Sequence, residues 1–140
     1  MYKIVTDSAW DETLQSAKEL DVVVVPFYVS FDEKNYLKEH KDIEIKEFYQ
    51  RIVESKAFPK TSLPSIQDYV DVFTQIVKDG FDIICYTISK KFSGSFNSAN
   101  VASQIVMDEY PDRTIKVFDS TLVTITQGLW IKMLANYRLT

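Results

Sequence analysis

The chain has 140 residues, 46% of them hydrophobic and 26% charged, which is typical of a single soluble globular domain. The net charge of −4 at pH 7 argues against a nucleic-acid partner, because nucleic-acid binding requires a basic face. The single cysteine, Cys85, excludes an internal disulfide and a cysteine-based metal site. No apolar run approaches the ~18 residues of a membrane span and no signal peptide is recognisable, so we expect a cytoplasmic protein.

The first forty residues predict strands, a polar turn and a short helix. An apolar run ends at Thr6-Asp7-Ser8, and a longer run of β-branched and aromatic residues is typical of a strand buried on both faces. Pro26 inside the longer run predicts an edge or a bend. The predicted elements are a strand at Tyr2–Val5, a helix at Asp11–Leu20, a strand at Val22–Phe31 and a partner strand at Asn35–Glu39.

The middle of the chain predicts two amphipathic helices separated by a loop. Apolar residues at helical spacing over Ile45–Val53 predict the first helix, and prolines bracket an expected loop at Ala57–Pro64. Ser65, with Asp68 three residues later, has the spacing of a capping box, and Gly80 suits the position just past the second helix. The expected buried stripe of that helix consists of Ile66, Tyr69, Val70, Phe73, Ile76 and Val77.

The last third of the chain alternates strands and helices with short connections. The predicted elements are a strand at Ile83–Ile88, a helix that starts near Gly94 and is stopped by Pro111, a strand at Ile115–Phe118 and a helix over Leu122–Tyr137. This alternation predicts an α/β fold with a mainly parallel sheet flanked by helices. We expect a single domain over residues 1–140, with a small antiparallel strand addition.

Three of the predicted strands end in hydroxyl and carboxylate side chains. In sheets of this kind ligands bind beyond the carboxyl ends of the strands, which places Thr6-Asp7-Ser8, Ser89–Ser95 and Asp119-Ser120-Thr121 on one rim. The cluster Thr61-Ser62-Leu63-Pro64-Ser65 opens another helix and should reach the same rim. The central glycine of Ser93-Gly94-Ser95 lets the backbone approach a ligand, and helix N-termini attract negative charge. The two hydroxyl-rich helix starts therefore predict a shared anion site.

The same residues allow other interpretations. The hydroxyls could do no more than cap helices, as such residues usually do. A phosphate-handling or acyl-transfer enzyme could use the Ser93-Gly94-Ser95 anion site together with Asp7, although Ala9 stands where aspartate-nucleophile phosphatases need a second aspartate. The only histidine, His40, lies in a charged segment, and glycine-rich nucleotide motifs and the hydrolase elbow are absent. A domain that meets a protein partner through its last helix is a third alternative.

Several short motifs occur in one order along the whole chain. They are Lys3-Ile4-Val5-Thr6-Asp7-Ser8, Val24-Val25-Pro26, Phe48-Tyr49, Lys60-Thr61-Ser62-Leu63-Pro64-Ser65, the stretch from Ile88 to Ala99, Phe118-Asp119-Ser120 and Gln127-Gly128. Together they resemble the DegV family of bacterial fatty-acid-binding proteins. The Thr-Ser-x-Pro-Ser and Ser-Gly-Ser motifs are the most specific of them.

The resemblance implies the Rossmann-like N-terminal lobe of a two-lobe protein that binds a long-chain fatty acid, with no turnover, metal or cofactor of its own. Thr61 matches the family's carboxylate-contacting threonine, and Ser93 with Gly94 matches its serine–glycine pair. Ser62 and Ser95 are expected ligand-binding neighbours. Supporting positions are Asp7, Ser8, Ser65, Asp119 and Ser120. Family members present the acid to a separate fatty acid kinase, which is the implied partner.

The chain departs from the family in its length, which is about half that of family proteins. In these proteins a second lobe follows the position of Gly128 and closes over the acyl chain. Without this lobe we expect exposed apolar surface on the last helix, including some of Trp130, Met133 and Leu134. A homodimer through that helix could cover the surface.

Overall fold

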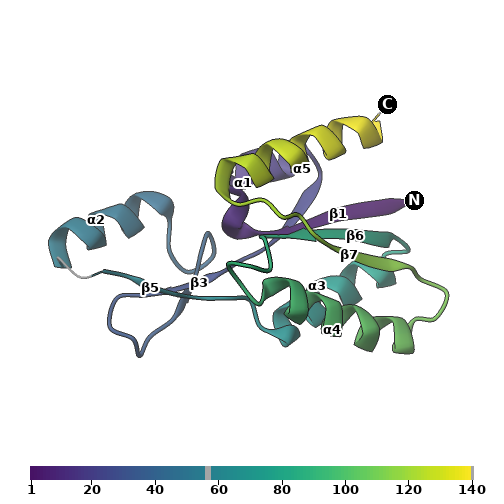
Figure 1. The fold of residues 1–140 in the computed structure, drawn as a ribbon, viewed down its shortest axis with the longest axis horizontal. Helices are drawn as coiled ribbons and strands as arrows, with labels where there is room; N and C mark the ends of the chain where they lie inside the picture. Colours follow the sequence, from purple (N-terminus) through teal and green to yellow (C-terminus); the bar gives the residue numbers. More distant parts are fainter. Residues whose placement is uncertain (56–57, 140) are drawn as a thin grey trace.

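A parallel four-stranded sheet forms the centre of the computed structural model, which describes residues 1–55 and 58–139 (Figure 1). The strand order is β2-β1-β6-β7, and each strand runs parallel to its neighbour. The strands are β1 (Tyr2–Asp7), β2 (Val22–Val25), β6 (Asp82–Thr87) and β7 (Ile115–Asp119). The predicted mainly parallel α/β fold is therefore confirmed.

Helices cover both faces of this sheet (Figure 1). One face carries α3 (Ile66–Lys78) and α4 (Ser95–Glu109), and the other carries α1 (Leu14–Glu19) and α5 (Thr124–Leu139). A short 3₁₀ helix, η1 (Ser8–Trp10), occupies part of the segment between β1 and α1. The longer helix expected at Asp11–Leu20 is thus shortened at its N-terminal end, where Thr13 accepts a hydrogen bond from the Ser16 amide and caps α1.

The hydrophobic core consists of two clusters, one on each face of the sheet. The larger cluster includes Tyr69 and Phe73 of α3, packed against β1, β6 and α4. The smaller cluster places Trp10 and Ile131 over β1 and β2. Full burial of a side chain such as Phe73 contributes about 1.5–3 kcal/mol to the free energy of folding. The two clusters together therefore hold the carboxyl ends of β1 and β6 in a fixed position.

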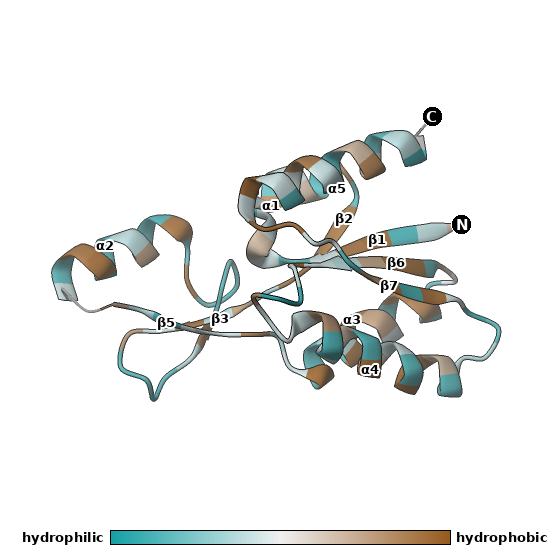
Figure 2. Ribbon diagram, viewed as in Figure 1, coloured by the Kyte–Doolittle hydropathy of each residue, from teal (hydrophilic) through white to brown (hydrophobic). Residues whose placement is uncertain are grey.

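An antiparallel addition extends from one end of the sheet (Figure 1). It contains β3 (Tyr28–Ser30), β4 (Leu37–Lys38) and β5 (Lys60–Ser62) in the order β4-β3-β5, together with α2 (Ile45–Ser55). We call residues 28–55 and 58–62 the arm. None of the residues of α2 is buried, although the helix is amphipathic (Figure 2).

Two predictions for the arm were wrong in detail. The long strand expected at Val22–Phe31 is divided at Pro26, and the backbone N–H of Phe27 donates to the Ser8 hydroxyl rather than continuing a strand pairing. The expected loop at Ala57–Pro64 contains β5, which pairs with β3; Ala57 itself lies outside the described residues. Local composition could not reveal this pairing, because its partner strand lies some thirty positions earlier in the chain.

The ends of α3 agree with their predicted signals. The Ser65 side chain accepts from the Asp68 amide and the Asp68 carboxylate accepts from the Ser65 amide, which completes the capping box. Gly80 follows the helix with φ of 89°, a left-handed conformation that favours glycine. The predicted stripe fails at Ile66, which is 39% exposed because it lies in the first turn.

Apolar residues occur along the length of α5 (Figure 2), and several of them are exposed. Gln127, Gly128, Ile131 and Ala135 form its buried side. Trp130 is 37% exposed and Met133 64% exposed, as expected, whereas Leu134 packs against the smaller core cluster. Ile125 and Leu129 extend the exposed face. Among residues 1–55 and 58–139, no helix is long and apolar enough to cross a membrane.

Asp68 joins the arm to the rest of the molecule. Its carboxylate accepts hydrogen bonds from the Tyr28 hydroxyl at 2.8 Å and from the Lys38 ammonium at 2.6 Å, in addition to the Ser65 groups. Burial alone would raise the pKa of Asp68, but the bonds from Lys38, Ser65 and Tyr28 outweigh it and lower the pKa to about 2. The charged carboxylate is therefore the form that the fold stabilises.

This depressed pKa predicts acid sensitivity. Asp68 contributes stability that is present above its unfolded value of 3.8 and is lost as pH falls through about 2. We expect Asp68→Asn to lower the midpoint of urea unfolding at pH 7 and to reduce the loss of stability between pH 4 and pH 2. Asp71→Asn is the matched control, because Asp71 is exposed on the same helix and accepts a hydrogen bond from the Gln67 amide. Equal acid sensitivity in the wild type and Asp68→Asn would contradict this assignment.

Candidate functional site

The three polar segments predicted for one rim lie together at the carboxyl ends of β1, β6 and β7. The backbone N–H of Ile88 donates to the Asp7 carboxylate at 2.9 Å, which ties the end of β1 to the loop after β6. The N–H of Ser120 donates to the Thr87 carbonyl at 3.2 Å, which ties that loop to the end of β7. The parallel register brings these segments together, as the sheet rule predicted.

Asp7 is the centre of this rim and is fully buried. One carboxylate oxygen, Oδ2, accepts from the Ser95 hydroxyl at 2.8 Å and from the Ile88 amide at 2.9 Å. The other, Oδ1, accepts from Nε2 of Gln127 at 2.9 Å. Burial raises the pKa of Asp7 above 3.8, against the opposing effect of these hydrogen bonds. Asp7 therefore fixes α4 and α5 to the sheet.

The N-terminus of α4 lies directly over Asp7. Ser95 opens the helix and is buried, and its hydroxyl is 2.7 Å from the hydroxyl of Tyr69 on α3. The Ser93 hydroxyl accepts from the Ser95 amide at 3.2 Å. Ser93 is half-buried and Gly94 exposed, so the positive end of the helix dipole is open to an anion beside these two residues.

Gly94 brings the two hydroxyl motifs into contact. Its φ of −77° is open to any residue, so backbone freedom does not explain this glycine. A Cβ atom built at Gly94 would lie 3.3 Å from Cδ2 of Leu63, which is tighter than an ordinary contact. The glycine therefore allows the segment around Leu63 to lie against the start of α4.

Thr61 and Ser62 belong to β5, which leads into this contact. They pair with Val29 and Tyr28 of β3, are both exposed, and directly precede Leu63, which lies against Gly94. The predicted ligand residues thus come from two segments that meet at Leu63 and Gly94: Thr61 and Ser62 from one, and Ser93, Gly94 and Ser95 from the other.

The predicted supporting residues divide into two groups. Asp119 accepts from the amides of Lys90 and Thr121, and the Ser120 hydroxyl accepts from the Leu122 amide, so both shape loops at the rim. Ser8 and Ser65 instead serve the arm. Ser8 donates to the Glu39 carboxylate, and Ser65 caps α3 and donates to Asp68.

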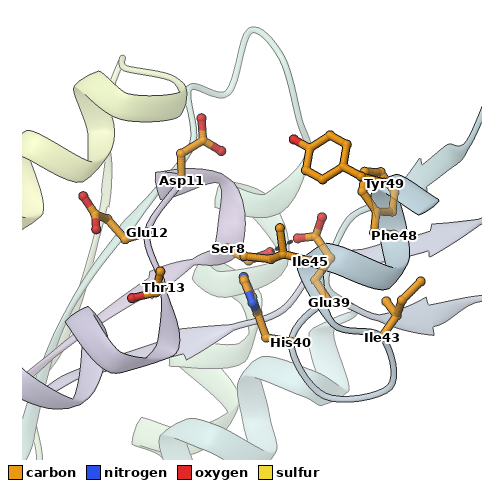
Figure 3. A pocket seen from close by; sticks show the side chains of 10 residues that line it. All are labelled: Ser8, Asp11, Glu12, Thr13, Glu39, His40, Ile43, Ile45, Phe48 and Tyr49. Carbon is orange, nitrogen blue, oxygen red and sulfur yellow. Dashed lines mark hydrogen bonds between the residues drawn. The ribbon is translucent and has the colours of Figure 1, made fainter. Parts of the chain in front are cut away.

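A cavity of about 320 Å³ lies between η1 and the arm (Figure 3). Figure 3 shows Asp11 and Glu12 on one side of it and the Phe48 and Tyr49 rings on the other. Its lining includes Ser8 and His40, but none of the five predicted ligand residues. This cavity is therefore not a pocket shared by Thr61 and Ser93. Among the described residues, no group of three potential metal ligands occurs.

Sequence reasoning missed two residues that organise the rim. Tyr69 was assigned to the core on its helical spacing, yet its hydroxyl bonds to Ser95. Gln127 was noted only as part of a motif, yet it is fully buried and donates to both Thr6 and Asp7. The sequence did contain a signal for Gln127, which is a side-chain amide among the apolar residues of the last helix. A buried amide requires hydrogen-bond partners.

Comparisons with known proteins agree with this architecture. Residues 1–138 match the model of a family described as uncharacterised proteins of the DegV family. A solved stearic acid-binding protein from Eubacterium ventriosum is 46% identical, with a TM-score of 0.94 over 99% of this chain and 48% of its own. A Thermotoga maritima relative named as a fatty acid-binding protein is 32% identical over 87% of this chain and 41% of its length.

The lengths of these relatives differ. The chain spans less than half of the Eubacterium and Thermotoga proteins. In contrast, it covers 90% of a 15.5 kDa DegV domain-containing protein from Staphylococcus aureus, with 33% identity over 95% of this chain. The similarity therefore extends to relatives of about this size as well as to longer ones.

Proposed function

The chain belongs to the DegV family, and we propose that it binds a long-chain fatty acid through the carboxylate of the acid. The contact between Leu63 and Gly94 is the observation that carries the proposal, because it joins the two hydroxyl motifs at an open helix N-terminus. Relatives with 32–46% identity are named for fatty acid or stearic acid binding.

The proposed head-group site uses uncharged donors. The Thr61 and Ser93 hydroxyls and the backbone at Gly94 would donate to the carboxylate oxygens, with Ser62 and Ser95 as neighbours. Hydrogen bonds to an ionised acceptor are about twice as strong as neutral ones, and the α4 dipole adds further attraction. Such a site holds an acid without activating it, which suits a carrier better than an enzyme.

The acyl chain requires apolar cover that the head-group site lacks. We propose that residues 1–140 act as the N-terminal lobe of a DegV-type carrier and that the exposed apolar side chains of α5, including Leu129 and Met133, face that cover. A second lobe or a second copy of this chain, as a homodimer, would supply it. By the same family resemblance, the carrier would present its acid to a fatty acid kinase in the cytoplasm.

The enzyme alternative receives no support from the position of Asp7. This carboxylate is fully buried and is bonded to Ser95, Ile88 and Gln127, so it is not presented to a substrate. The only histidine, His40, lines the cavity beside the arm rather than the start of α4. We therefore propose the carrier function alone.

Binding is tested by titrating delipidated protein with stearate and recording complexes by native mass spectrometry and calorimetry. We expect one fatty acid per head-group site. Thr61→Val and Ser93→Ala should each weaken binding about 5- to 150-fold, which corresponds to the ~1–3 kcal/mol lost with a hydrogen bond to a charged group. Both variants keep the backbone: valine replaces the Thr61 hydroxyl with a methyl group, and alanine removes the Ser93 hydroxyl.

Thr114→Val is the matched control for this experiment. Thr114 is exposed and precedes β7, at the opposite end of the sheet from the rim, so its replacement should leave stearate affinity at the wild-type value. Protein that ignores stearate but binds phosphorylated ligands would refute the carrier proposal. If both Thr61→Val and Ser93→Ala bind stearate with wild-type affinity, the head-group site does not lie at these residues.

A further inference from the structure

A buried acid lies directly beneath the proposed head-group site. The Asp7 carboxylate is bonded to Ser95, the first residue of α4, and Ser95 in turn bonds through its amide to Ser93. A ligand carboxylate at Ser93 and Gly94 would therefore share one hydrogen-bond network with Asp7. Two like charges in such a network disfavour each other, as in paired carboxylates that share a site.

Among the described residues, the groups that donate hydrogen bonds to Asp7 are all uncharged. Its bonds come from the Gln127 amide, the Ser95 hydroxyl and the backbone amides of Ile88 and Ala9. Tyr69 on α3 and Cys85 on β6 interact with its charge, and both are buried and neutral in their ordinary state. Asp68 at the start of α3 also interacts with Tyr69, and its charge is paired with the Lys38 ammonium at 2.6 Å.

Gln127 has an unused acceptor that could bind a proton carried by Asp7. In the present arrangement its Nε2 donates to Asp7 Oδ1 and to Thr6, while its Oε1 is buried with no partner among the described residues. Rotation of the amide by a half turn exchanges these two atoms, so that the N–H bonds to Thr6 and Asp7 are given up and Nε2 takes the position in which Oε1 now has no partner. The unpaired oxygen would then accept from an Asp7 protonated at Oδ1, and Oδ2 would keep its bonds to Ser95 and Ile88.

We propose that Asp7 takes up one proton from water when a carboxylate binds at the start of α4, and that Gln127 rotates to accept the new O–H. The inference rests on the proposed function. The negative charge beneath the site disappears as the negative charge of the ligand arrives. Because binding consumes a proton, raising the pH weakens it, with a limit of tenfold in affinity per pH unit.

The experiment is calorimetric titration of the full chain with stearate between pH 6 and pH 9, in two buffers of different protonation enthalpy. The wild type should take up as much as one proton per stearate and lose affinity as the pH rises. Asp7→Asn should bind with no proton uptake and no pH dependence. Asp112→Asn, at an exposed position, is the charge-matched control and should keep the wild-type slope. Stearyl alcohol, which has the same chain and a neutral head, should show no proton uptake.

A second measurement does not depend on any variant. Carboxyl ¹³C NMR of wild-type protein should show that saturating stearate raises the titration midpoint of Asp7. Stearate binding with no proton uptake, or with an equal pH slope in Asp7→Asn, overturns the inference and leaves the carrier function intact. An Asp7 midpoint that stearate does not move overturns it in the same way. Absence of stearate binding at every pH overturns both.

Discussion

Gly128→Ala is expected to destabilise the protein by about 3 kcal/mol, at the upper end of the range for overpacking. A Cβ atom at this position would lie 2.3 Å from the carbonyl oxygen of Trp10, a distance that real contacts do not reach. The obstacle is backbone, so α5 and η1 must separate. Alanine is the better helix former by about 1 kcal/mol, but this gain is too small to offset the clash.

The measurement is urea unfolding of Gly128→Ala, with Asn136→Ala as its matched control. Asn136 is exposed on the same helix, so its replacement reports helix propensity alone and should raise stability by about 0.5 kcal/mol. We expect near-ultraviolet dichroism to change in Gly128→Ala as well, because Trp10 is fully buried in the smaller core cluster. Unchanged or increased stability in Gly128→Ala would show that η1 and α5 are not held in contact as described.

The alternation of strands and helices was readable from sequence because each element carries strong local signals. The Ser65–Asp68 capping box and Gly80 fixed the ends of α3 through backbone chemistry that requires these residue types. The shared rim followed from parallel topology. In contrast, β5 could not be recognised, because three exposed residues form a strand only through pairing with β3.

The orientation of α5 shows a second limit of local pattern. Its apolar residues cover much of the helix circumference, so hydrophobic spacing does not choose the buried face. Gly128 and Gln127 determine the buried face instead. Gly128 allows the close approach of α5 to Trp10, and Gln127 forms hydrogen bonds to Thr6 and Asp7. Both interactions join segments more than 110 positions apart, which is why the predicted site contained Asp7 and Ser95 but not Gln127.

Asp7→Ala is expected to cost about 3–5 kcal/mol of stability. The substitution leaves the Ile88 amide, the Ser95 hydroxyl and the Gln127 amide facing an empty buried space, and each unpaired donor costs about 1–3 kcal/mol. The loss should appear as an earlier urea midpoint and as faster hydrogen exchange at Ile88 and in the first turn of α4.

Asp7→Asn separates hydrogen bonding from charge at the same position. The asparagine carbonyl can accept from Ile88 and Ser95, and its amide can donate to Gln127 Oε1 after the rotation described above, so the cost should stay below about 1 kcal/mol. A large loss in this variant would show that the ionised carboxylate itself is required.

The pH dependence of unfolding gives a sharper test of how the wild type and Asp7→Asn differ. Burial raises the pKa of Asp7 in the folded state, so its contribution is fully present below the unfolded value of 3.8 and is lost as pH rises through the folded value. The wild type should therefore lose stability relative to Asp7→Asn as the pH rises, and the difference between the two urea midpoints should become constant above the folded pKa. Parallel midpoints from pH 4 to pH 9 would contradict a raised pKa of Asp7, because a folded state that keeps its proton above 3.8 must lose stability relative to Asp7→Asn as the pH rises.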